Sequence, residues 1–197
     1  MGFRIPEQGK EEIHARIESS GAGSKRPKTT AAEFDDYYLL VMLGISSGMG
    51  LPEEDADEGI LGDCREFRQQ WAAPHDYKPV YHSLVGLVIS VRMEEIGIDT
   101  KDPKVVNDYL QTMLSEKEED PFTTQYFQCI NNFANAGAKY IRYIPRQKME
   151  WEIFIQDYYN PLCKALLNDG RPDGKEVEKL KDLWTMQEEM ASSSEEE

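Results

Sequence analysis

The segment from Pro121 to Met149 carries the longest helical pattern in the chain. Apolar or small residues recur there at intervals of three and four, at Phe122, Tyr126, Ile130, Phe133, Gly137, Ile141 and Ile144. This spacing places about one such residue per turn on one face of an α-helix. It predicts a helix that ends at Pro145, because the proline ring removes a backbone donor.

The same segment contains no Asp or Glu, although 37 of the 197 residues are acidic and the net charge is −15. Its second half instead combines cations with tyrosines. Cations contact phosphates and aromatic rings stack on unpaired bases, so this composition is typical of a surface for single-stranded RNA. The predicted nucleic-acid-binding residues are Lys139, Tyr140, Arg142, Tyr143, Arg146 and Lys148.

The basic segment also admits two other interpretations. Lys139 and Arg142 would pair with carboxylates of neighbouring helices while the tyrosines belong partly to the core, or the segment would bind an acidic protein. The corresponding alternative function is an acidic protein-protein interaction adaptor or regulator that binds no nucleic acid.

Helical spacing recurs along the rest of the chain, punctuated by Gly and Pro. Asp102-Pro103 predicts a capped helix start, Gly97 predicts a helix end, and Asn160-Pro161 predicts a kink or break. No segment reads as a strand. Besides the helix that ends at Pro145, we expect helices from Thr30 to Gly48, from Asp63 to Trp71, and over residues 80–96, 103–114, 151–162 and 177–184.

These helices predict an all-α fold, an irregular bundle of six or seven helices with flexible ends. Residues 1–30 read as a flexible basic arm, 31–190 as the helical domain and 191–197 as a disordered acidic tail. The cluster Lys25-Arg26-Pro27-Lys28 in the arm is a solvated linker, a phosphate-contacting arm or a nuclear-import signal.

Three scattered cysteines and the absence of an apolar N-terminal stretch favour a reduced, intracellular and cytoplasmic protein. The longest apolar run, residues 84–91, is too short to span a bilayer, so no membrane association is expected.

No motif specifies a reaction, a metal or a cofactor. Residues 55–66 partly match a calcium-loop template, but Ile60 stands where the template requires glycine, which favours a solvated acidic loop. His75, His82 and Cys64 are the residues that a helical enzyme would use. We expect a non-enzymatic protein with no cofactor.

One stretch resembles a known family. In the string Phe127-Gln128-Cys129-Ile130-Asn131-Asn132-Phe133-Ala134, the residues Gln128, Phe133 and Ala134 are similar to a motif in the coat-protein core of flexuous filamentous plant viruses. Ala136, Tyr140 and Ile141 resemble the potyvirus form of that helix. The family's arginine, which the resemblance implies would contact RNA, is replaced here by Phe127.

The resemblance implies an all-helical core whose flexible arms join neighbouring subunits in a virion. Together with the basic segment, it leads us to expect a coat-like or nucleocapsid-like protein that forms a homo-oligomer or larger complex and binds single-stranded nucleic acid.

Overall fold

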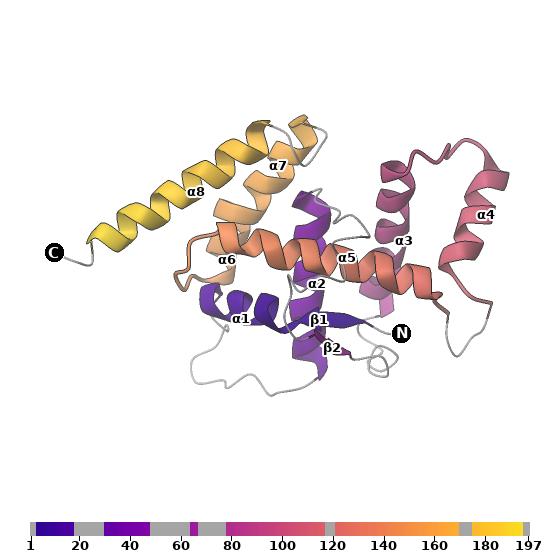
Figure 1. Cartoon of the computed structure of the whole chain (residues 1–197), viewed down its shortest axis with the longest axis horizontal. Helices are drawn as coiled ribbons and strands as arrows, with labels where there is room; N and C mark the ends of the chain where they lie inside the picture. The colour runs from indigo at the N-terminus through magenta and orange to yellow at the C-terminus, as the bar shows by residue number, and fades with distance from the viewer. Residues whose placement is uncertain are drawn as a thin grey trace. The chain divides into compact units, whose positions relative to one another are not determined.

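A computed structural model describes residues 3–17, 30–47, 64–66, 78–116, 121–169 and 175–194 (Figure 1). Most of these residues are helical, and the α-helices are labelled α1 to α8. Helices α6 and α7 continue into each other, so these ranges contain seven separate helices. The predicted all-α fold with six or seven helices is confirmed.

The chain divides into two compact units. Unit 1 comprises Met1–Arg4 and Glu66–Asn131, and unit 2 comprises Ile5–Arg65 and Asn132–Glu197. The helical domain expected over residues 31–190 therefore consists of two units. Their boundary falls inside helix α5, Thr124–Tyr140.

Unit 1 contains helix α3, Lys78–Glu95, and helix α4, Pro103–Met113. Helix α3 ends as the sequence predicts, because Gly97 adopts a φ of 71° and its N–H donates to the carbonyl of Glu94. The N–H of Ile98 donates to the carbonyl of Met93 at 2.9 Å. This pair of bonds is a Schellman motif, which satisfies carbonyls at the helix end.

Helix α4 begins at the predicted Asp-Pro pair. The Asp102 carboxylate accepts hydrogen bonds from the backbone N–H groups of Lys104 and Val105. After α4, Leu114 forms an antiparallel bridge with Phe122. The first turn of α5 then packs in an aromatic cluster of unit 1, formed by Phe3, Phe122, Tyr126 and Phe127.

Unit 2 contains helix α1 (Glu7–Arg16), helix α2 (Thr30–Ser47) and the second half of α5, which continues as the 3-10 helix η3 (Ile141–Tyr143). It also holds α6 (Trp151–Phe154), the π-helix η4 (Ile155–Tyr159), α7 (Asn160–Asp169) and α8 (Lys175–Ser194). Helix α7 packs against α2 and α8, and helix α1 packs against α2 and η3.

Glycines allow α2 and α5 to cross with their backbones in contact. A Cβ atom added to Gly44 would lie 1.9 Å from the carbonyl oxygen of Phe133, and one added to Gly137 would lie 1.8 Å from that of Leu40. Real Cβ atoms essentially never approach a backbone atom so closely. Only glycine therefore fits at either position.

The helix from α6 to α7 does not break at Asn160-Pro161. The chain instead forms the π-helical turn η4 directly before these residues and remains helical to Asp169. A proline has no N–H to donate within a helix. A single π-helical turn inside an α-helix, like a proline, is a known cause of local distortion of the helix.

Three other expectations are wrong for residues that the structure describes. Residues 3–17 of the predicted flexible arm form strand β1, Arg4–Pro6, and helix α1, with Phe3, Ile5 and Ile13 buried. Cys64–Glu66, assigned to a helix, form strand β2, which pairs with β1. Residues 191–194 of the predicted tail belong to α8.

Candidate nucleic-acid interface

Burial accounts for most of the acid-free segment. No residue from Cys129 to Ile141 is exposed. The polar Asn135 is only 6% exposed, and Lys139, one of the predicted binding residues, is half-buried. Burying a carboxylate without a partner is costly, so a helix enclosed on all sides excludes Asp and Glu whatever its function.

Tyr140 lies in the core and not at the surface where we expected it to stack on bases. Its side chain is fully buried, with its ring edge-on to Trp184 at a centroid distance of 6.1 Å. Burial, with smaller effects of Glu178 and Tyr143, raises the pKa of its hydroxyl above the ordinary range. Within the described part of the chain this hydroxyl has no hydrogen-bond partner.

Tyr143 is half-buried, and its ring contacts a cation of the protein itself. The ammonium group of Lys181, on helix α8, lies 4.9 Å from the centre of the Tyr143 ring and 2.9 Å from the Glu178 carboxylate. Lys181 is itself buried at 8% exposure. This cation-π contact occupies one face of the ring, on which a base cannot stack at the same time.

Three of the six predicted residues remain at the surface. Arg142 and Lys148 are exposed, and the side chain of Arg146 is 62% exposed. We call Arg142, Arg146 and Lys148 the basic edge. Among the residues that the structure describes, Arg142 and Lys148 form no ion pair.

Buried Arg16 fixes both ends of the loop that carries Arg146 and Lys148. Its Nε donates to the carbonyl of Ile144 at 2.7 Å, and its own carbonyl accepts from the N–H of Met149 at 2.7 Å. Next to it, Ile17 and Met149 form a parallel bridge. The loop is therefore held by the N-terminal helix, and its two cations project from a fixed frame.

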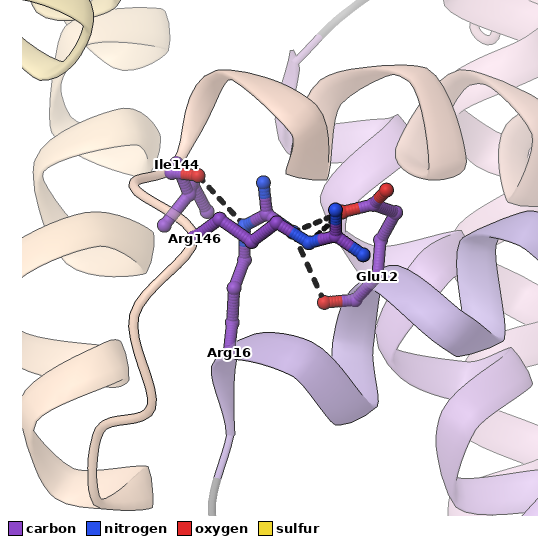
Figure 2. Close-up of polar contacts among 4 residues, drawn as sticks. All are labelled: Glu12, Arg16, Ile144 and Arg146. Carbon is purple, nitrogen blue, oxygen red and sulfur yellow. Dashed lines mark hydrogen bonds and ion pairs between the residues drawn. The ribbon is translucent and has the colours of Figure 1, made fainter. Parts of the chain in front are cut away.

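Glu12 balances the charge of Arg16 and also reaches the basic edge. Its carboxylate accepts a hydrogen bond from Arg16 one turn later in helix α1 and lies 3.8 Å from Nε of Arg146 (Figure 2). Sequence reasoning missed Glu12 and Arg16, because both lie in a polar stretch that was taken for a flexible arm.

Trp151 is a large aromatic residue at the surface. It is 41% exposed, and its ring stacks on that of Phe154 at a centroid distance of 5.7 Å. It lies in the first turn of α6, three residues after Lys148. An aromatic side chain at the surface therefore lies next to the basic edge in the sequence.

The other sites considered from the sequence gain no support. Three of them lie outside the described residues: His75, the acidic loop at 55–63 and Lys25-Arg26-Pro27-Lys28. The residues that the structure describes contain no group of three His, Cys, Asp or Glu side chains that could hold a metal ion.

A chain of side-chain hydrogen bonds links α7, α2 and η4. Cys163 donates to Ser46 at 3.3 Å, and Ser46 donates to Tyr159 at 3.3 Å. Burial raises the pKa of Tyr159 to about 12, so its hydroxyl stays protonated at neutral pH.

Within the described ranges, no helix combines the length and apolar character needed to cross a membrane.

At Phe127, where the coat-protein motif has its arginine, the structure shows a buried ring 5.0 Å from that of Phe3. No protein-family model, curated protein or solved structure matches the chain.

Proposed function

We propose that this protein is a non-enzymatic helical assembly protein, coat-like or nucleocapsid-like, that binds single-stranded nucleic acid through its basic edge. The observation that carries the proposal is the exposure of Arg142, Arg146 and Lys148, the last two on a loop that Arg16 holds at both ends. Cations on a fixed frame contact phosphates without first being ordered.

Binding of this kind depends on phosphates and not on base stacking by Tyr140 or Tyr143. Three phosphate contacts predict a logarithmic salt dependence with a slope of about −2 for a single strand. The affinity should vary little with sequence, because phosphate contacts carry no base information. With a net charge of −15, the binding of a polyanion to this protein must be local.

The experiment is fluorescence anisotropy of a labelled single-stranded RNA with the double variant Arg142→Glu and Lys148→Glu. We expect affinity to fall roughly 25-fold at 0.1 M salt, because each lost phosphate contact removes about 0.7 logarithmic units there. The matched control is Lys101→Glu with Lys104→Glu, two exposed lysines in unit 1 that give the same change in net charge.

Equal losses in the two double variants would show that overall charge, and not the basic edge, governs binding. Unchanged binding in the basic-edge variant would refute the proposal. The same protein in size-exclusion chromatography, read at 260 and 280 nm, reports assembly and bound nucleic acid together. A protein of this function acts in the cytoplasm, and in a virion if it is a coat protein.

A second candidate function is an acidic protein-interaction adaptor. The observation in its favour is that part of the predicted basic face is internally occupied, by Glu12 at Arg146 and by Lys181 at Tyr143. It predicts a chromatography peak free of nucleic acid and no anisotropy change at moderate salt. A wild-type protein that binds RNA with the salt slope given above would exclude it.

A further inference from the structure

The Glu12 carboxylate has two arginine partners of different character (Figure 2). Arg16 lies one turn away on the same helix, and its side chain is 3% exposed. Arg146 comes from the basic edge, and its side chain is 62% exposed. Glu12 itself is 15% exposed, so one oxygen atom, Oε2, faces both a buried and a solvated guanidinium group.

Arg16 is the permanent partner. Besides the Glu12 carboxylate it donates to the backbone carbonyl of Glu12 at 3.2 Å and to that of Ile144 at 2.7 Å. A buried guanidinium that loses such partners is strongly destabilising, so Arg16 does not leave. Arg146 lies 3.8 Å from Glu12, at the outer limit of an ion pair, and its side chain is 62% exposed. An exposed ion pair of this kind contributes little stability.

We infer that Glu12 is a competing anion of the basic edge: it occupies Arg146 in the free protein, and a phosphate of the bound nucleic acid displaces it. The inference rests on the proposed function and names the residue that sets the affinity of that site. When Arg146 turns to a phosphate, Glu12 keeps its bond to Arg16. No uncompensated carboxylate is left behind, so the exchange costs little.

The arrangement also explains how α1 influences the site without contacting the ligand. Helix α1 supplies both the clamp on the loop, through Arg16, and the counter-charge, through Glu12. The basic edge consequently offers two cations, Arg142 and Lys148, at first contact, and its third only after exchange. A ligand with several adjacent phosphates suits this order, because one part of it binds Arg142 and Lys148 while a neighbouring phosphate replaces Glu12 at Arg146.

The test is a double-mutant cycle of Glu12→Gln and Arg146→Gln, read by anisotropy of the labelled RNA. Glutamine keeps an acceptor for Arg16 but removes the charge. We expect Glu12→Gln to tighten binding about two- to fivefold, the range of a solvent-exposed ion pair. When Arg146 has been replaced by Gln, Glu12→Gln should increase the affinity for RNA no more than the control substitution Glu11→Gln does.

The control is Glu11→Gln, the adjacent exposed carboxylate on the same helix, which makes the same change in net charge. If Glu12→Gln and Glu11→Gln act equally, or if the effect of Glu12→Gln persists without Arg146, the inference is wrong while the proposed function stands. If the wild-type protein binds no RNA, both fall.

A second measurement needs no change at Glu12. In an NMR spectrum of arginine Nε–Hε groups, with Arg146 assigned by its loss in Arg146→Gln, saturating RNA should shift the Arg146 signal and leave that of Arg16 in place. An unshifted Arg146 signal in a complex that anisotropy shows to be formed would overturn the inference.

Discussion

Replacing Gly137 by alanine tests whether the backbone contact between α2 and α5 organises unit 2. The new Cβ atom would lie 1.8 Å from the carbonyl oxygen of Leu40, and contacts below 3.0 Å are essentially absent from real structures. The obstructing atom belongs to the backbone of a buried helix residue, so a side-chain rotation cannot relieve the clash. The two helices must separate by more than 1 Å at their crossing.

Separating two packed helices costs free energy throughout the contact. Gaps of 0.5–1 Å already remove a quarter to a half of each dispersion contact, and overpacked cores typically lose about 1–3 kcal/mol, occasionally more. We place Gly137→Ala at the upper end, about 3 kcal/mol, because the backbone is rigid. Alanine returns about 1 kcal/mol through its higher helix propensity, so the net destabilisation should be about 2 kcal/mol.

The assay is urea unfolding followed by far-UV circular dichroism. With a slope of about 2 kcal/mol per molar urea, the midpoint of Gly137→Ala should fall by about 1 M. The matched control is Gly86→Ala in helix α3, where an added Cβ meets nothing within 4 Å. The same chemical change should there raise the stability by about 0.5–1 kcal/mol.

Opposite signs for the two glycines are the result that supports this reasoning. A Gly137→Ala variant as stable as the wild type would mean that the two helices do not approach at this position. Equal gains at both glycines would show that helix propensity alone, and not the crossing, determines the outcome.

Two further predictions concern tyrosines. Tyr140→Phe removes a buried hydroxyl that has no partner among the described residues, so we expect the free energy of unfolding to rise by about 1 kcal/mol and RNA affinity to stay unchanged. Burial raises the pKa values of Tyr109 and Tyr159 to about 12, whereas unfolded tyrosines ionise near 10.0. The unfolded state then binds fewer protons between these pH values, so stability should be constant below pH 10 and fall as the pH rises toward 12. The urea midpoints of unfolding at pH 9, 10 and 11 measure the fall in stability, and absorbance at 295 nm reports the ionisation of tyrosine. A midpoint that does not change with pH would contradict the prediction.

Local chemistry made most helix boundaries predictable. Asp102 caps α4 through its own carboxylate, and Gly97 ends α3 through a conformation that glycine adopts easily. Both effects involve residues within one or two turns of each other, so the sequence contains the whole interaction. At Asn160-Pro161 the sequence predicted a kink or break, and the structure rules out the break, because a π-helical turn precedes these residues and the chain stays helical.

The candidate site was only partly predictable, because two different causes remove carboxylates from a segment. Burial excludes them from α5 between Cys129 and Ile141, whereas the remaining cations lie at or beyond its end. Composition cannot separate the two, and periodicity showed a single apolar face where the structure encloses the helix on all sides. Tyr140 was consequently assigned to the surface.

Helix α1 escaped prediction for a different reason. It has few apolar residues, and its anchoring depends on Gly9, which lies close to Ala138, and on Arg16. In a polar stretch, neither a glycine nor an arginine indicates from the sequence that its position is buried. The partners Ala138 and Ile144 lie more than a hundred residues away in the chain, so no pattern within the helix indicates these contacts.

The Arg16 clamp has a consequence for synthesis of the protein on the ribosome. Arg16 and Ile144 are 128 residues apart in the chain. At about 5–20 residues per second, α1 therefore waits about 6–26 s before the carbonyl that it holds has been made. During this interval its buried arginine and apolar residues have no native partner in the C-terminal half. The loop that carries Arg146 and Lys148, in contrast, can contact Arg16 as soon as it leaves the ribosome. Because this loop is made late, the basic edge should become ordered in one of the last steps of folding.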